Sequence, residues 1–228
     1  MSLFLSTLLL LDPLGDDLGS GYAYPSAAIY QDRGFADLVG FAAHNQDGQL
    51  VLEIKLKSGA EIPEPTMVLI FVDSAPGGEE QLGDSGFATP PGAGWEWSYL
   101  LNAWDTVERS FTGEQRMLER RLSHDSVLIT TGRPFADSYG YYVMSGLYDP
   151  FSEWGLRPVQ PGGGVWTLDG PVGAPMPVDV IANNQPLAYA QKVLPPAGEE
   201  PSGVSAKLAL AVSLLGAGTI ALAFLLFR

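Results

Sequence analysis

Hydrophobic and polar residues alternate through several short segments of the chain with the two-residue period of a β-strand. In residues 50–57, Leu52, Ile54 and Leu56 fall on one face and charged residues fall on the other, which predicts a strand with one buried face. Residues 67–73 are apolar on both faces up to Asp73, and such a run is typical of an inner strand.

Further runs rich in β-branched and aromatic residues predict more strands, and glycine and proline residues separate them. These runs span residues 7–11, 35–44, 95–104, 117–123, 126–131, 139–147 and 177–181. Long amphipathic helices are hard to find in the sequence. The pattern therefore predicts an all-β fold, a two-sheet antiparallel β-sandwich, followed by a single C-terminal transmembrane helix.

The C-terminal part of the chain differs from the rest in composition. Residues 208–227 carry no charge and are flanked by Lys207 and Arg228, and their length matches the roughly 20 helical residues that cross a bilayer. The preceding residues are rich in proline, which predicts an extended linker. We therefore expect a β domain over 1–192, a linker over 193–206 and a membrane helix over 207–228.

The N-terminal residues 1–11 are apolar but lack the basic segment and cleavage site of a signal peptide. We favour a first strand here, with a signal sequence upstream, so that the β domain is extracytoplasmic and anchored by a single span. If translation instead starts at Met1, the chain would be a tail-anchored protein facing the cytoplasm.

Charge and cysteine content exclude several classes of function. The 228 residues carry a formal net charge of −14, which disfavours nucleic-acid binding because phosphate backbones are bound by basic surfaces. The acidic excess attracts divalent cations, or it simply maintains solubility. With no cysteine in the chain, disulfides, thiolate metal sites and thiol nucleophiles are excluded.

A short acidic segment follows the first predicted strand. It holds Asp12, Asp16 and Asp17 together with glycines at positions 15, 19 and 21. Hard divalent cations prefer oxygen ligands, and glycines let the backbone curl around an ion. The alternative is a turn in which these carboxylates accept backbone N–H groups without a metal.

The same segment carries a family resemblance. Residues 12–25 resemble the Asp-Pro-x-Gly-Asp-Asp-x-Gly-x-Gly-x-Tyr-x-Tyr-Pro signature of the glucodextranase C-terminal domain, a β-sandwich related to the DOMON group of sugar- and haem-binding domains. Weaker similarity extends the resemblance over about residues 7–182.

In that family the module accompanies surface-held enzymes that act on α-glucans, and it is associated with calcium, carbohydrate binding and attachment to the cell surface. The resemblance implies a calcium role for Asp12, Asp16 and Asp17. We expect Asp73 as a fourth ligand, because a carboxylate at a strand end could fold back onto the loop.

Aromatic residues supply the candidate carbohydrate site. The candidates for a stacking platform are Trp95, Trp97, Trp104, Trp154, Trp166, Tyr141 and Tyr142. Trp95, Trp97 and Tyr99 alternate along one predicted strand, which favours a core position for these three residues. Trp154 and Trp166 lie beside predicted loops, so we expect them, with Tyr141, to bind a glycan.

Two further hypotheses concern partners and haem. Arg116, Arg120 and Arg121 either form a docking stripe for an acidic protein partner or lie on a solvated strand face. Because DOMON relatives include b-type cytochromes, Met67 and Met144 are candidate haem ligands, although a strand methionine is more often a core residue.

The sequence favours a non-enzymatic function, because His44 and His124, the only histidines, lie in no recognisable catalytic motif. The leading hypothesis is a membrane-anchored, extracytoplasmic module with structural calcium that acts in protein interaction or scaffolding, at the cell surface or in a membrane complex. The alternative is a binding module for an α-glucan or envelope glycan. A third hypothesis is a haem-binding electron-transfer subunit.

Overall fold

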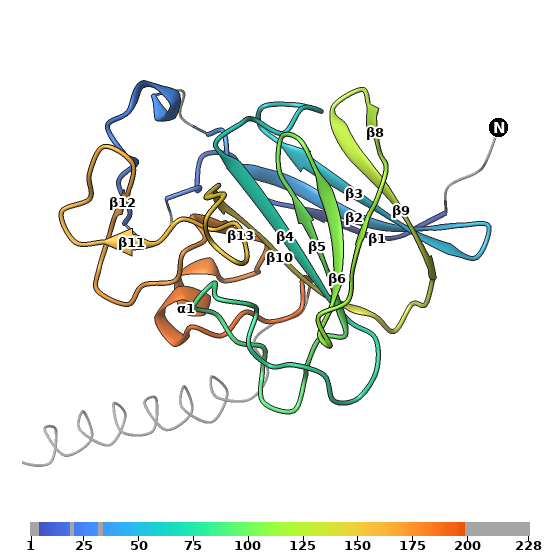
Figure 1. Cartoon of the computed structure of the whole chain (residues 1–228). Helices are drawn as coiled ribbons and strands as arrows, with labels where there is room; N and C mark the ends of the chain where they lie inside the picture. The colour runs from blue at the N-terminus through green and yellow to red at the C-terminus, as the bar shows by residue number, and fades with distance from the viewer. Residues whose placement is uncertain (1–4, 19–20, 32–33, 199–228) are drawn as a thin grey trace, which may run out of the picture.

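Two antiparallel β-sheets form the body of the protein in the computed structural model, which describes residues 5–18, 21–31 and 34–198 (Figure 1). The five-stranded sheet has the order β1 (Leu5–Leu11), β2 (Leu38–Gln46), β3 (Gln49–Leu56), β9 (Ser126–Pro134) and β8 (Arg120–Ser123). The six-stranded sheet has the order β13 (Asp179–Val180), β10 (Gly140–Leu147), β4 (Thr66–Asp73), β5 (Trp97–Leu101), β6 (Thr106–Ser110) and β7 (Gln115–Met117). The prediction of an all-β, two-sheet antiparallel fold is confirmed.

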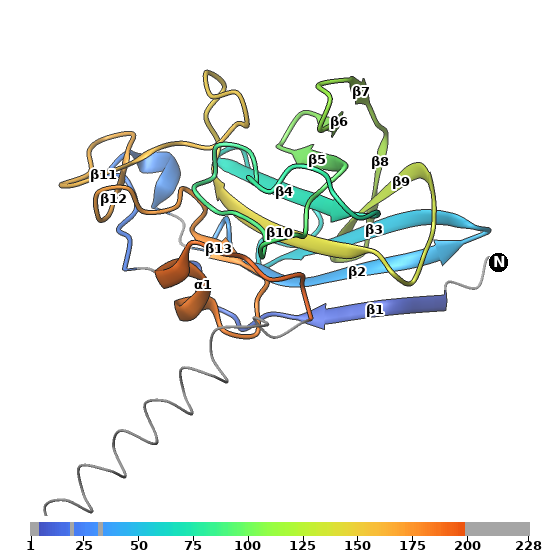
Figure 2. The ribbon, with the colours of Figure 1, turned by 90° about the horizontal axis from the view of Figure 1, so that it is seen from below.

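Loops and short elements cover the outer face of the six-stranded sheet (Figure 2). They include the 3-10 helix η1 (Ala28–Tyr30), the short parallel pair β11 (Val159–Gln160) and β12 (Leu168–Asp169), and the helix α1 (Gln185–Gln191). Asn184 caps the N-terminus of α1, and its Oδ1 accepts the Leu187 N–H at 3.1 Å. This cap satisfies a backbone donor at the helix start.

The first hydrophobic core lies between the two sheets. Leu52, Ile54 and Leu56 of β3 are buried there, so the predicted alternation in this strand is confirmed. On the opposite face of the five-stranded sheet, Glu53 pairs with His44 at 2.8 Å. The two-residue period therefore decides which side chains enter the core.

A second core lies between the six-stranded sheet and the loops that cover it. Leu69 and Phe71 of β4 point into this core, whereas Val68 and Ile70 point into the first. Strand β4 is thus buried on both faces, which explains its continuous apolar run. Met67 and Met144, the candidate haem ligands, are packed in the second core and are at most 2% exposed.

The ordered domain continues past the predicted boundary at residue 192. Leu194 is fully buried, and its N–H donates to the carbonyl of Ala88 at 2.9 Å. The Ala197 N–H donates to the Tyr141 carbonyl at 2.6 Å. Residues 193–197 therefore close the sandwich.

The predicted membrane helix over 207–228 lies outside the described residues and stays a prediction. Within the part of the chain that the structure describes, no helix has the length and apolar character needed to cross a membrane.

Candidate functional site

Three carboxylates meet at one end of the sandwich. Asp12 and Asp16 lie on the loop after β1, and Asp179 begins β13. One oxygen from each of the three side chains lies within 4.8 Å of the other two. Asp179 is fully buried and accepts the Leu38 N–H at 2.7 Å, so the fold fixes its position.

Gln185, the first residue of α1, faces this acidic cluster. Its Nε2 donates to Asp16 Oδ2 at 2.9 Å and to Asp179 Oδ1 at 3.1 Å, and it lies 3.5 Å from Asp12 Oδ2. The residue is only 6% exposed, and its Oε1 has no hydrogen-bond partner among the described residues. One neutral amide cannot balance three negative charges, because buried charges need compensating charge. The cluster therefore has the oxygen-rich chemistry of a hard-cation site.

The pKa values of these carboxyls reflect the missing positive charge. Burial and the charge of Asp16 raise the pKa of Asp12 to about 7. Burial and the charge of Asp12 raise the pKa of Asp179 to about 9. Burial also raises the pKa of Asp16. Without a cation, the site thus favours the protonated acids.

Other acidic residues support the loop rather than join the three carboxylates. Asp17 Oδ2 accepts a hydrogen bond from the Tyr24 hydroxyl, which ties together the two ends of the signature. Asp37, which is fully buried, accepts the Gly15 N–H at 2.8 Å and pairs with Lys57 at 3.2 Å.

Asp73 lies away from this site. In the six-stranded sheet, Asp179 lies opposite Ser145 of β10, and Ser145 lies opposite Val68 of β4. Asp73 lies five residues further along β4, which corresponds to roughly 17 Å at the usual strand rise. The expected return of this carboxylate to the acidic loop is therefore not found, because the straight strand carries it to the opposite end of the sheet.

The raised pKa values predict a pH dependence in the presence of a chelator. A carboxyl whose pKa is raised by folding stabilises the native state at low pH, and this contribution is lost as pH rises through the native pKa. For Asp12 and Asp179 the loss runs from about pH 4 to about 7 and 9. We expect the melting temperature in chelator to fall between pH 5 and pH 9, and Asp179→Asn to flatten this fall. A melting temperature that rises over this range would contradict the assignment.

Two of the three predicted glycan-binding residues are buried. Tyr141 is 3% exposed and packs against Phe41 between the sheets. Trp154 is 9% exposed, and the Arg109 guanidinium lies over its ring at 4.4 Å. Gly83 packs directly against the same ring, since a Cβ atom added to Gly83 would lie only 2.5 Å from it. Arg109 and the Gly83 backbone therefore occupy the space that a sugar would need, and Trp154 is an unsuitable platform.

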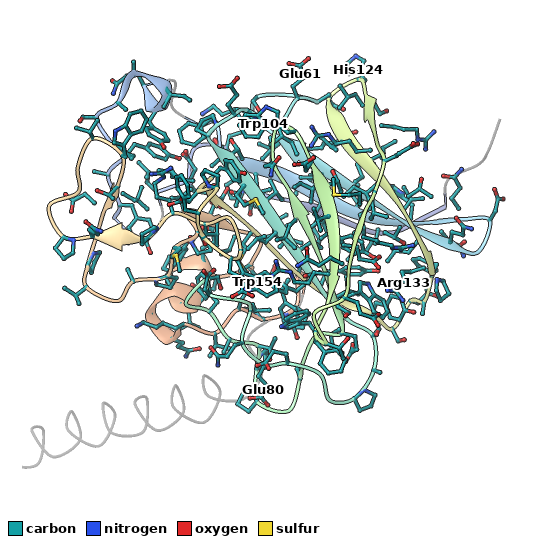
Figure 3. The ribbon with its side chains drawn as sticks, in the orientation of Figure 1. Glu61, Glu80, Trp104, His124, Arg133 and Trp154 are labelled. Atoms are coloured by element: carbon teal, nitrogen blue, oxygen red, sulfur yellow. The ribbon has the colours of Figure 1, made fainter. Side chains whose placement is uncertain are left out.

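Trp104, labelled with Trp154 in Figure 3, lies on the turn between β5 and β6. It has the exposed ring that Trp154 lacks. It is 60% exposed and packs against Tyr148 with ring centroids 5.5 Å apart. The backbone N–H of Trp104 donates to Asn102 Oδ1 at 2.9 Å. The Arg120 guanidinium donates to the carbonyls of residues 102 and 103, so the turn is held from two sides.

A groove of about 700 Å³ opens beside Trp104. Its lining combines carboxylates, a guanidinium and aliphatic side chains: Glu61, Glu64, Arg120, Ile62 and Leu122. An exposed aromatic ring beside convergent polar groups is the usual composition of a small-molecule or glycan site. Trp104 belonged to the aromatic set in the sequence, but proximity to predicted loops favoured Trp154 and Trp166 over it.

Trp166 is the third predicted glycan-binding residue, and its ring is 55% exposed. It meets the buried Tyr30 edge-on at 6.3 Å. The structure therefore leaves Trp166 accessible, on a loop beside η1.

The three arginines of the predicted docking stripe have different environments. Arg116 is paired with the buried Glu108 at 2.8 Å, and Arg120 holds the Trp104 turn. Arg121 lies exposed on β8, and no ion pair or hydrogen bond of its guanidinium is found among the described residues. Since two of the three guanidinium groups are engaged within the domain, a common docking stripe is poorly supported.

Comparison with known proteins gives one family. The sequence profile described as the C-terminal, SLH-like binding module of glucodextranase matches residues 8–196. No curated protein matches the chain. The matched range includes the acidic cluster, the Trp104 groove and Trp166.

Proposed function

Because the chain belongs to the family of glucodextranase C-terminal binding modules, we propose that it is a non-catalytic carbohydrate-binding module and that the groove beside Trp104 takes an α-glucan. The observation that carries the proposal is the exposed Trp104 ring, 60% accessible and backed by Tyr148, above a groove lined with polar groups.

The groove offers each kind of contact that a hexose requires. The Trp104 face packs against the apolar face of a sugar ring, much as aromatic rings pack against other apolar surfaces. Glu61 and Glu64 would accept hydrogen bonds from sugar hydroxyls, and Arg120 supports the wall of the groove by holding the Trp104 turn. Because two glutamates and one arginine line the open groove, neutral glucans fit it better than acidic glycans do.

A glycan partner is favoured over a scaffolding role. The family description names a binding module of an enzyme whose name refers to a glucan, and the arginines of the supposed docking stripe are mostly engaged within the domain. Protein docking therefore takes second place to carbohydrate binding.

We also propose a structural calcium ion at the acidic cluster. Asp12, Asp16 and Asp179 would supply carboxylate oxygens, and Gln185 would supply its carbonyl oxygen after rotation of the amide. The unpartnered Gln185 Oε1 and Asp16 Oδ1 support this ligand set. Calcium would then join the loop after β1 to β13 and α1, which are distant in sequence.

Native gel electrophoresis with soluble glucans embedded in the gel tests the proposed function. We expect the protein to migrate more slowly in gels that contain dextran, pullulan or glycogen than in a gel without polysaccharide. A soluble β-glucan serves as the matched control. Equal mobility in every gel, at high polysaccharide concentration, would contradict carbohydrate binding.

A further inference from the structure

Trp104 and Trp166 are the two tryptophans with rings more than half exposed among the described residues. They come from segments far apart in sequence, yet both lie near the end of the sandwich at which β4 begins. Tyr148, which backs Trp104, donates its N–H to the Pro65 carbonyl just before β4. Figure 1 places η1, β11 and β12, which surround Trp166, beyond this end of the sheet.

Contacts extend from each tryptophan toward the residues that lie between them. Trp104 packs against Tyr148 with ring centroids 5.5 Å apart, and the Tyr148 carbonyl accepts a hydrogen bond from Arg157 Nη2 at 3.1 Å. Arg157 and Asp149 both act electrostatically on the Tyr30 hydroxyl. Tyr30 then meets Trp166 at 6.3 Å.

The Trp166 end of this row is held in place by backbone hydrogen bonds. The N–H groups of Ser26 and Ala27 donate to the carbonyls of Gly164 and Val165, each at 3.1 Å. These bonds join the Trp166 loop to the segment that precedes η1. A rigid aromatic platform loses little conformational entropy when it binds a ligand.

The row combines aromatic and polar groups. Aromatic faces stand at both ends, and the planar polar groups of Asp149 and Arg157 lie between them, partly exposed. A linear polysaccharide has the complementary pattern, because each sugar presents apolar ring faces and hydroxyl edges. A single hexose beside Trp104 would leave the rest of the row uncovered.

We infer that the glycan site extends from the Trp104 groove across Tyr148 and Arg157 to Trp166, so that it binds an internal stretch of a linear glucan chain. The inference rests on the proposed function and adds to it that the ligand is a chain that reaches from Trp104 to Trp166. Trp104 forms the primary subsite, and Trp166 forms a distal subsite that only longer chains reach.

Equilibrium titration with α-glucan oligosaccharides of increasing length tests this inference. For the wild-type protein, the dissociation constant is expected to fall with chain length until the chain spans both tryptophans. Trp166→Ala should leave the affinity for the shortest ligands unchanged and weaken binding of the longest ones about tenfold. Trp104→Ala should weaken binding at every length.

Phe111→Ala is the matched control, because Phe111 is 54% exposed but lies just past the far end of β6 from the Trp104 turn. It should bind every ligand as the wild type does. If Trp166→Ala matches the wild type at every length while Trp104→Ala weakens binding, the extended site is refuted and the proposed function stands. If the wild type binds no glucan of any length, the proposed function and the extended site both fail.

Discussion

Calcium is expected to raise the melting temperature of this protein by about 5–10 °C when its concentration is about a hundred times the dissociation constant. The acidic cluster explains the size of this effect. Three carboxylates lie within 4.8 Å of one another, and a single amide faces them. A divalent cation would remove the mutual repulsion. It would bind only the folded chain, because Gln185 lies 169 residues from Asp16 in the sequence.

Asp179→Asn tests the ligand set with little change in shape. The variant should be at least as stable as the wild type in chelator, since burial and the neighbouring Asp12 raise the pKa of Asp179 to about 9 and already favour an uncharged group there. It should gain no stability from calcium. Differential scanning calorimetry in calcium and in chelator provides the measurement.

Asp73→Asn is the control for the calcium experiment, because Asp73 lies at the opposite end of β4. Its gain from calcium should equal that of the wild type. Identical melting temperatures of the wild type in calcium and chelator would refute the calcium site, and loss of the gain in Asp73→Asn would refute the ligand set.

The strands could be predicted wherever the hydrophobic pattern was regular. Strands β3, β4 and β10 follow their predicted segments closely. Strand β6 was missed because its pattern is inverted: Glu108 is buried and Val107 is partly exposed. Glu108 is tolerated inside because Arg116 and Arg133 bind its two oxygens. These arginines come from other strands, so the local sequence gives no sign of the arrangement.

The candidate sites show the same limit. The acidic loop was recognisable from Asp12 and Asp16, but Asp179 and Gln185 reach it only through the pairing of β13 with β10. A single carboxylate inside the apolar run 177–181 was the available signal. Trp154 and Trp104 both lie in loops, and only the three-dimensional contacts of Arg109 and Gly83 distinguish the covered ring from the open one.

Trp104→Ala is expected to weaken α-glucan binding at least tenfold, which corresponds to about 1.4 kcal/mol or more. Trp104 is the one aromatic side chain among the residues that line the groove, so its removal takes away the face that would pack against a sugar ring. The fold should be retained, because the side chain is 60% exposed and the turn is still held by Arg120. Circular dichroism melting curves verify that retention.

Isothermal titration of a soluble α-glucan into the wild type, Trp104→Ala and Phe111→Ala measures the carbohydrate site most directly. A glycan-binding groove at Trp104 predicts saturable binding by the wild type and by Phe111→Ala, and a dissociation constant at least about tenfold higher for Trp104→Ala. Equal affinity of all three proteins, with Trp104→Ala fully folded, would contradict the assignment of the groove. Absence of binding by the folded wild type would contradict carbohydrate recognition itself.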